Sequence, residues 1–214
     1  MVAAMRGYRM VLIMPEHLSL ERRQTMAAYG AEIVLTPKEG GMEAARDLAD
    51  RMIAEGKGVM LDQFANPDNP RSHYEGTGPE LWRQTEGRIS HFVSSMGTTG
   101  TIMGAGRYLK ERNSRIKIWG IDTYGSVFKK YKETGIFDKN EIYPYITEGI
   151  GEDFLPQNVD FSVIDHFEKV TDRDAALMTR RIAREEGIFA GNSAGSAMAG
   201  VLQLREHFKK GDMV

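Results

Sequence analysis

Short apolar runs alternate with amphipathic segments along most of the chain. Several runs are continuously apolar, as expected for strands buried on both faces of a sheet. Strands that alternate with helical patterns are typical of a parallel sheet with helical crossovers. The pattern therefore predicts an α/β fold. Its expected strands are Met10–Met14, Glu32–Thr36, Val59–Leu61, His91–Ser94, Lys117–Ile121 and Val163–Val170.

Three helices are defined by their spacing and their end residues. Ser19 is an expected N-cap for Leu20–Tyr29, and Gly30 ends that helix. Met42–Ala54 carries apolar residues at helical spacing. Thr171, followed by Asp174, is a variant of the capping box and opens a helix that runs to Glu186.

One long segment, Asp122–Pro156, lacks a clear period. Long unpatterned connections in compact domains are usually functional or disordered. Tyr143-Pro144-Tyr145 is rigid and aromatic, and Glu148-Gly149-Ile150-Gly151 is a glycine-rich turn that would let backbone approach a ligand closely. These features favour function, with a mobile surface loop as the alternative.

Both ends of the chain have the pattern of interrupted elements. Met1–Arg6 is typical of the second half of an apolar helix, and Met10 opens a strand with nothing before it to pair with. Gly211-Asp212-Met213-Val214 is typical of a turn followed by the start of another strand. We therefore expect a fragment of a longer protein.

Composition narrows the class of protein. The 214 residues include no Cys, so thiol catalysis and Cys-ligated metals are excluded and nothing indicates an oxidising compartment. The net charge is −2 with no basic stripe, which argues against nucleic-acid binding. The chain has neither a signal peptide nor a run that would span a bilayer, and its five His show no metal-ligand spacing. We expect a cytoplasmic protein without a metal site.

The most specific motif is Ser94–Thr101, between a predicted strand and a helix that runs to about Asn113. Glycines let backbone N–H groups point inward, the helix N-terminus adds positive potential, and threonines supply hydroxyls. The motif predicts a phosphate cradle, with an empty strand-to-helix turn as the alternative. It lacks the lysine of a P-loop, which favours a compact phosphomonoester.

A dinucleotide-binding fold is a competing interpretation of this motif. Asp122 follows the next strand, where a ribose-binding acid belongs. However, Gly97, Gly100, Gly104 and Gly106 contain no G-x-G-x-x-G, which argues against that fold.

The second motif is Ala190–Ser196, between an apolar stretch and a helix rich in Ala and Gly. In isolation, Ser193 is best explained as a helix N-cap. Gly191–Gly195 also matches the G-x-S-x-G spacing of a hydrolase nucleophile. Only His207 follows it, with Glu206 beside it, so a hydrolase is disfavoured.

Taken in order, these stretches resemble the fold-type II pyridoxal-phosphate enzymes, the tryptophan synthase β-like fold, of the cysteine synthase (O-acetylserine sulfhydrylase B) and cystathionine β-synthase family. The resemblance covers essentially the whole chain. Its first part resembles cysteine synthase B and its last part leans toward cystathionine β-synthase. The matching motifs are Gly7-Tyr8-Arg9, Met14-Pro15-Glu16, Ser19–Arg23, Tyr29–Glu32, Asp62–Pro70, Ser94–Thr101, Glu148–Gly151, Phe154-Leu155-Pro156 and Gly191–Ser196.

The resemblance implies two α/β domains with largely parallel sheets: residues 1–66 as an incomplete small N-terminal domain, and residues 67–214 as a larger cofactor-binding domain without its last strand. It implies pyridoxal 5'-phosphate as cofactor. The phosphate-binding residues would be Gly97, Thr98, Thr99, Gly100 and Thr101, and Ser193 would bond the pyridine nitrogen. Gln63 would lie near the substrate carboxylate, and Glu148, Gly149, Ile150 and Gly151 beside the reacting amino acid.

The implied reaction is β-replacement, in which O-acetylserine or serine loses its β-substituent and sulfide or homocysteine adds. The implied assembly is a homodimer of the full-length parent. The family's Schiff-base lysine and Asn-bearing carboxylate loop would both precede residue 1, so no catalytic residue is expected in these 214. We therefore expect this chain alone to be inactive. A cystathionine β-synthase-like enzyme and a non-catalytic phosphate-ligand module remain the alternatives.

The remaining departures concern lysines and one position before Ser193. Asn192 replaces the small or apolar residue expected there. The lysines present are expected to be solvated surface charges. They include Lys38, Lys57, Lys110, Lys117, Lys129 and Lys169.

Overall fold

The computed structural model describes residues 1–214, which divide into two compact units, Met1–Leu61 and Asp62–Val214. Every predicted strand except Val59–Leu61 is present, with ends displaced by at most three residues. All strand pairs are parallel, as the alternation of strands and helices predicted. No helix is both long enough and apolar enough to cross a membrane.

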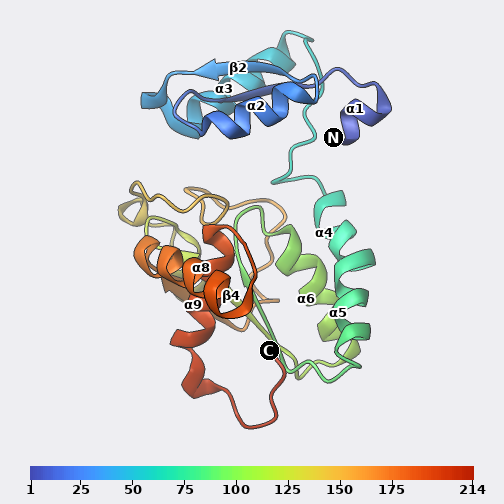
Figure 1. Ribbon diagram of the computed structural model, residues 1–214, viewed down its shortest axis with the longest axis vertical. Helices are drawn as coiled ribbons and strands as arrows, with labels where there is room; N and C mark the ends of the chain where they lie inside the picture. Colours follow the sequence, from blue (N-terminus) through green and yellow to red (C-terminus); the bar gives the residue numbers. More distant parts are fainter. The chain divides into compact units, whose positions relative to one another are not determined.

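The first unit is a two-stranded sheet with helices packed on it (Figure 1). Val11 lies opposite Glu32 in the register. Met14 and Ala45 are its buried apolar side chains, so its core is small. The elements are α1 (Val2–Arg6), β1 (Val11–Pro15), α2 (Leu20–Ala28), β2 (Glu32–Thr36), the 3₁₀ turn η1 (Lys38–Gly40) and α3 (Gly41–Ala54).

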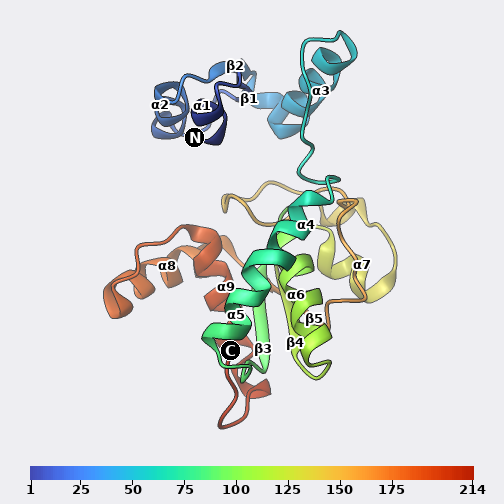
Figure 2. The same cartoon turned by 90° about the vertical axis from the view of Figure 1, so that its right-hand side faces the viewer.

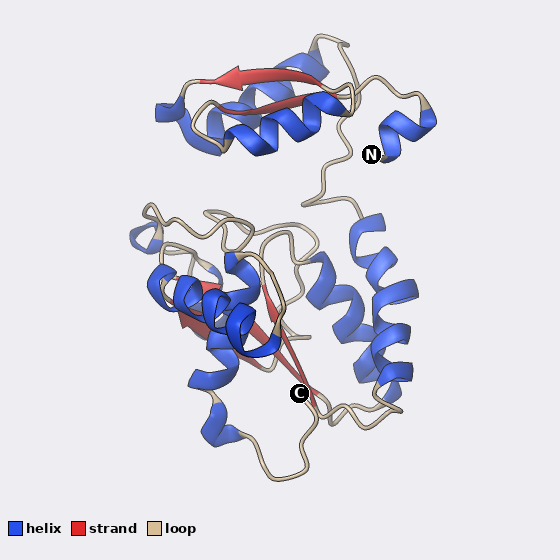
Figure 3. Ribbon diagram, in the orientation of Figure 1, coloured by secondary structure: helices blue, strands red, loops and turns tan.

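The second unit is built on a three-stranded sheet in the order β3-β4-β5 (Figure 3). Its first half comprises α4 (Asp68–Ser72), the π-helical turn η2 (His73–Thr77), α5 (Gly78–Gln84), β3 (His91–Ser95), α6 (Gly100–Arg112) and β4 (Lys117–Thr123). Its second half comprises α7 (Phe128–Thr134), η3 (Lys139–Glu141), β5 (His166–Val170), α8 (Asp172–Glu186), α9 (Asn192–Gln203) and η4 (Arg205–His207).

Side chains alternate across β4 and separate two hydrophobic cores. Ile118 belongs to the core that α6 and α7 cover, whereas Trp119 and Ile121 belong to the core that α8 and α9 cover. Figure 2 shows these two groups of helices on opposite sides of the sheet. Both faces of the parallel sheet are therefore buried, which explains the continuous apolar runs in its strands.

Two helix contacts depend on glycine. A Cβ on Gly104 of α6 would clash with the Pro70 carbonyl and come within 2.7 Å of the His73 Cβ. A Cβ on Gly195 of α9 would clash with Thr179 of α8. Side chains at these positions would force the helices apart, so both glycines set how closely the helices approach.

One expected strand is absent. Val59–Leu61 pairs with no strand; Val59 is 90% exposed, and the segment is irregular. Ser19 is the N-cap of α2, as expected, although its side chain makes no capping hydrogen bond. The segment Asp122–Pro156, which lacks a clear period, contains the short elements α7 and η3.

The predicted cap of α8 forms, whereas the strand predicted to start after Gly211 does not. The Thr171 hydroxyl accepts a hydrogen bond from the Asp174 N–H at 3.1 Å, so Thr171 caps α8 as predicted. Near the other predicted turn, the Met213 carbonyl accepts hydrogen bonds from the N–H groups of Ser90 and His91. Met213 thus lies beside the edge strand β3, although no strand forms there.

We predict that Gly104→Ala destabilises the second unit by about 1–3 kcal/mol, because the added methyl meets backbone that cannot move freely. Gly106→Ala, on the same helix, is the matched control, since its Cβ would lie 3.3 Å from the Ile118 and Val163 methyl groups. Urea unfolding followed by tryptophan fluorescence measures both variants. Equal unfolding free energies for the two would contradict the close-packing account.

Candidate functional site

The loop Met96–Thr99 leads from the end of β3 into α6, and the residues predicted as the cradle, 97–101, lie in this loop and in the first turn of α6. The Met96 N–H donates to the Ile121 carbonyl at 3.0 Å, which fixes the loop to the neighbouring strand. Thr99 has a φ of +68°, in the left-handed region that a β-branched residue rarely adopts. This strained backbone turns the chain directly into the first turn of α6, whose N–H groups have no partner within the helix.

The three threonine hydroxyls have different surroundings. Thr98 Oγ1 accepts a hydrogen bond from Asn69 Nδ2 at 3.0 Å, and Thr101 Oγ1 lies 3.2 Å from His73 Nε2. Thr99 Oγ1 is buried and has no hydrogen-bond partner. A buried hydroxyl without a partner is costly, so Thr99 is the one threonine whose hydroxyl is prepared for an external acceptor.

Gly97 and Gly100 are needed for close approach. A Cβ on Gly97 would lie 3.1 Å from the Gly149 carbonyl oxygen. A Cβ on Gly100 would clash with the Asn69 side chain. That side chain is held in place by its hydrogen bonds to Thr98 and to the Gln63 carbonyl. The glycines therefore let two other segments close over the loop.

One of those segments is Glu148–Gly151. Gly149 and Gly151 have φ values of +77° and +76°, where glycine is favoured. The Gly151 N–H donates to the Met96 carbonyl at 2.6 Å, and a Cβ on Gly149 would lie 4.0 Å from Ser193 Oγ. The structure thus brings together the cradle, the glycine-rich turn and Ser193.

Ser193 lies in the first turn of α9, whose N-cap is Gly191, so the interpretation of Ser193 as the N-cap is wrong. The hydrolase alternative also fails. A nucleophile elbow needs a strand before its serine, but Ile188 and Phe189 are irregular and Phe189 is 99% exposed. His207 contacts the rings of Trp119 and His166 instead.

Gln63 is exposed, and its backbone rather than its side chain forms the recorded contacts. Its carbonyl oxygen accepts from Asn69 Nδ2 at 2.8 Å and from Asn158 Nδ2 at 3.1 Å. Asn69 therefore links Gln63 to Thr98 in the cradle. Sequence reasoning missed the role of Asn69, although it lies within the matching run Asp62–Pro70.

Asp122, at the end of β4, is fully buried. Its Oδ2 accepts from the Lys129 N–H at 3.0 Å, while its Oδ1 has no partner. Burial raises the pKa of Asp122, against the opposing effects of Ser126, the Lys129 N–H and the Lys169 charge. A carboxyl group enclosed in this way cannot meet a ribose, so the dinucleotide alternative loses its key residue.

The expectation that the lysines are solvated is wrong for Lys169. Its Nζ is buried and bonds the Ser126 carbonyl at 2.8 Å and Glu141 Oε2 at 2.6 Å. Lys110 and Lys129 are paired with Asp165 and Glu168, respectively. These lysines are committed to the framework of the second unit.

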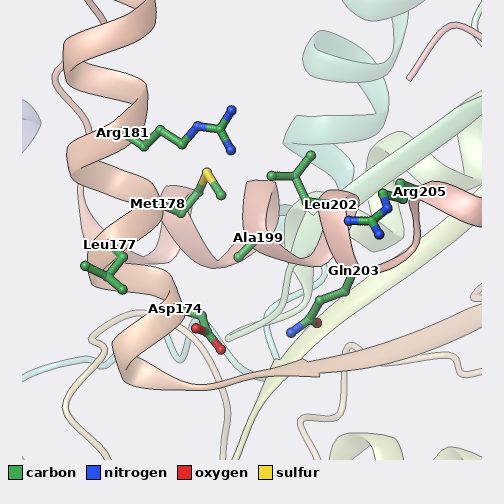
Figure 4. Close-up of a pocket in the computed structure, with 8 residues that line it drawn as sticks. All are labelled: Asp174, Leu177, Met178, Arg181, Ala199, Leu202, Gln203 and Arg205. Carbon is green, nitrogen blue, oxygen red and sulfur yellow. The ribbon is translucent and has the colours of Figure 1, made fainter.

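A cavity of about 370 Å³ lies elsewhere, between α8 and α9 (Figure 4). Arg181 and Arg205 line it together with the apolar side chains of Leu177, Met178 and Leu202. None of the predicted site residues lines this cavity.

The candidate site lies instead where several loops meet, at the carboxyl ends of β3 and β4, which is where open α/β sheets bind ligands.

Comparison with known proteins gives the following matches. A family model described as "Pyridoxal-phosphate dependent enzyme" matches residues 1–214. Cysteine synthase B of Pseudomonas aeruginosa is 47% identical over 100% of this chain and 67% of its own length. Cystathionine beta-synthase of Dictyostelium discoideum is 38% identical over 99% of this chain and 42% of its own length.

The chain is also similar to solved structures. A crystal structure of O-ureido-L-serine synthase has a TM-score of 0.89 and 36% identity, covering 99% of this chain and 65% of that one. A crystal structure of cysteine synthase from Entamoeba histolytica has a TM-score of 0.84 and 33% identity, and the match covers 97% of this chain and 59% of that one. The chain spans 62% of the length of the cysteine synthase B proteins of Salmonella typhimurium and Escherichia coli.

We predict that Asp122→Asn gains stability relative to the unaltered chain as the pH rises. The pKa of Asp122 is higher in the folded state than in the unfolded state. Its protonated form therefore contributes to the free energy of unfolding, fully below the unfolded-state pKa, and this contribution is lost as the pH rises through the folded-state pKa. Each unit of that rise in pKa corresponds to about 1.4 kcal/mol. The neutral amide of the variant does not ionise, so it would carry no such cost.

Urea unfolding of both proteins between about pH 4 and pH 8 measures this difference. Asp153→Asn, at an exposed carboxylate of the same unit, controls for the change in net charge. A difference in unfolding free energy that does not change with pH would contradict the account of Asp122.

Proposed function

The chain belongs to the family of pyridoxal-phosphate-dependent enzymes, and on that premise we propose that it forms the cofactor-binding part of an enzyme that makes cysteine. The reaction is β-replacement on an activated serine. The C–O bond to acetate in O-acetylserine breaks, and a C–S bond to sulfide forms. The observation that carries this proposal is the convergence of the cradle, the turn Glu148–Gly151 and Ser193.

The cradle suits the cofactor phosphate. A phosphate dianion would accept from the free N–H groups at the start of α6 and from the unpartnered hydroxyl of Thr99. Gly97, Thr98 and Gly100 would complete the cradle with their backbone N–H groups. Thr101 would contribute its N–H alone, because its hydroxyl faces His73. The strained backbone of Thr99 would then be explained by its role in binding the phosphate.

Ser193 suits a neutral ring nitrogen. Its hydroxyl can donate a hydrogen bond to the pyridine nitrogen, whereas a carboxylate there would favour the protonated ring. When bound, pyridoxal phosphate supplies an electron sink for the reacting amino acid. A neutral ring is a weaker sink, which suits β-elimination and replacement better than transamination.

The segments around Gln63 and Gly149 would bind the amino acid. Gln63 is exposed beside Asn69 and is available for the substrate carboxylate. Glu148, Gly149, Ile150 and Gly151 would line the other side, where backbone can approach the substrate closely. These residues orient the substrate and limit its access to water, which lowers the entropic cost of reaction.

O-acetylserine and sulfide are favoured over serine and homocysteine as substrates. The cysteine synthase B proteins are 47% identical to this chain, whereas the cystathionine beta-synthases are 38–39% identical. The family assignment allows either reaction. An assay with each pair of substrates distinguishes them.

The 214 residues alone would bind the cofactor without turning over substrate. The family's catalytic lysine would have to lie beside the cradle, and Lys110, Lys129 and Lys169 are paired elsewhere. A positioned acid–base group contributes about 100- to 10,000-fold to the rate of a reaction. The pairing of these three lysines away from the cradle favours a second function for the isolated chain, that of a non-catalytic phosphate-ligand module.

We predict that Gly97→Val weakens the binding of pyridoxal phosphate by at least about tenfold, because its side chain would press on the Gly149 carbonyl. Gly58→Val is the matched control, since no atom lies within 4 Å of its Cβ. Titration of each purified variant with the cofactor, followed by absorption and fluorescence, measures the affinities. Equal affinities in the two variants would place the phosphate elsewhere.

We also predict that the product of the complete gene makes cysteine from O-acetylserine and sulfide, and that the 214-residue chain does not exceed the rate of free pyridoxal phosphate. The 214-residue Ser193→Asp variant reports on the ring contact through the absorption of bound cofactor. If only serine and homocysteine react, the alternative substrates are correct. Turnover by the 214-residue chain well above the free-cofactor rate would overturn the account of the lysine.

A further inference from the structure

The turn Glu148–Gly151 is anchored just before it begins. Asp172, the first residue of α8, accepts hydrogen bonds at 2.8 Å from the N–H groups of Ile146 and Thr147. It also accepts one at 2.6 Å from the Thr147 hydroxyl. Thr147 is buried, so its two bonds to Asp172 are partly shielded from water, whereas the bond from Ile146 is exposed. One carboxylate thus holds two consecutive backbone amides that lie 25 and 26 residues earlier in the chain.

The turn is anchored again just after it ends. The Gly151 N–H donates to the Met96 carbonyl, and the Glu152 N–H donates to Ser126 Oγ at 3.1 Å. The Val127 N–H donates in turn to the Glu152 carbonyl. These contacts lead to the cradle and to β4. The residues between the two anchors have left-handed glycines and no strand to fix them.

The helix that carries Asp172 also determines the position of Ser193. Thr179 of α8 donates from Oγ1 to the Gly191 carbonyl at 3.3 Å, at the N-cap of α9. Gly195 of α9 packs directly on Thr179, with no room for a side chain. Asp172 and Ser193 are therefore connected through one rigid pair of helices, and the turn lies against Ser193 at Gly149.

We propose that Asp172 is a positioning residue, which holds the turn Glu148–Gly151 at a fixed place relative to Ser193 and so determines how well the site binds its amino-acid substrate. The inference rests on the proposed function, because that function places the turn beside the substrate. Asp172 contacts neither cofactor nor substrate. Its effect passes through the backbone of Ile146 and Thr147.

The arrangement requires the ionised form of Asp172. All three recorded partners are donors, and both carboxylate oxygens accept. Burial tends to raise the pKa of Asp172, but the hydrogen bonds from Thr147 and Ile146 outweigh it and the pKa is lowered. Asparagine has only one acceptor oxygen, so its NH₂ group would face one of the N–H donors.

The experiment uses the product of the complete gene, loaded with pyridoxal phosphate, and compares Asp172→Asn with Asp174→Asn. Asp174 lies in the same turn of α8, and its carboxylate contacts only the Thr171 hydroxyl among the recorded bonds. The control therefore makes the same chemical change without touching the turn. Thr147→Val and Thr147→Ser form a second pair, in which only serine keeps the hydroxyl.

Three quantities are measured: amide hydrogen exchange at Ile146 and Thr147, affinity for pyridoxal phosphate, and affinity for O-acetylserine from the absorption of the bound cofactor. For Asp172→Asn we expect exchange to rise and O-acetylserine affinity to fall by about tenfold or more, since bonds to a charged acceptor are lost. Cofactor affinity should stay within about twofold. Thr147→Val should weaken substrate binding, and Thr147→Ser should restore it.

Two results would overturn the inference alone. The first is unchanged exchange at Ile146 and Thr147 in Asp172→Asn, since the carboxylate would then not hold them. The second is faster exchange with unchanged O-acetylserine affinity, since the contact would then be structural only. A protein that binds cofactor but no O-acetylserine before any substitution would instead overturn the proposed function, and this inference with it.

Discussion

The hydrogen bond from the Gly151 N–H to the Met96 carbonyl joins the two loops on which the candidate site depends. It forms only because Gly151 takes a left-handed conformation and Gly97 leaves room for the Gly149 carbonyl. The parallel sheet supplies the setting, since the carboxyl ends of β3 and β4 lie at one edge. Ser193 reaches the same place from the far side of the sheet, through the close packing of α8, α9 and β4.

The site carries features that would be unfavourable without a ligand. Thr99 combines a left-handed backbone with a buried hydroxyl that has no partner. Such features persist where the surrounding structure enforces them, and they cluster at functional sites. The two hydrophobic cores of the second unit supply that support, because they bury both faces of the sheet beneath the loops.

Five of the six predicted strands and the turn at the end of β3 could be predicted from the sequence, because both depend on local patterns. Continuous apolar runs identified these strands, and glycine and threonine identified the strand-to-helix turn that we propose as the cradle. The long helical stretch from Asp68 to Gln84 was not predicted, since Pro70, Gly76 and Pro79 are typical helix breakers. Pro70 lies in the first turn of α4, and the π-helical turn before Pro79 accommodates its missing N–H.

Long-range partners were the other part that patterns could not supply. Asp172 was recognised only as part of a helix start, because nothing local shows that its carboxylate bonds Ile146 and Thr147. Lys169 was expected to be solvated, yet it is buried against Glu141 and the Ser126 carbonyl. Val59–Leu61 has strand-forming residues but no neighbouring strand to pair with. In each case, tertiary contacts decide what the local sequence leaves open.

The central claim is that the turn at the end of β3 binds the cofactor phosphate while Ser193 meets the ring. A crystal structure of the chain with pyridoxal phosphate tests it most directly. The account predicts the phosphate within hydrogen-bond distance of the N–H groups of residues 97–101 and of Thr99 Oγ1, with the ring nitrogen at Ser193 Oγ. A phosphate bound elsewhere, such as between Arg181 and Arg205 in the cavity of α8 and α9, would contradict it.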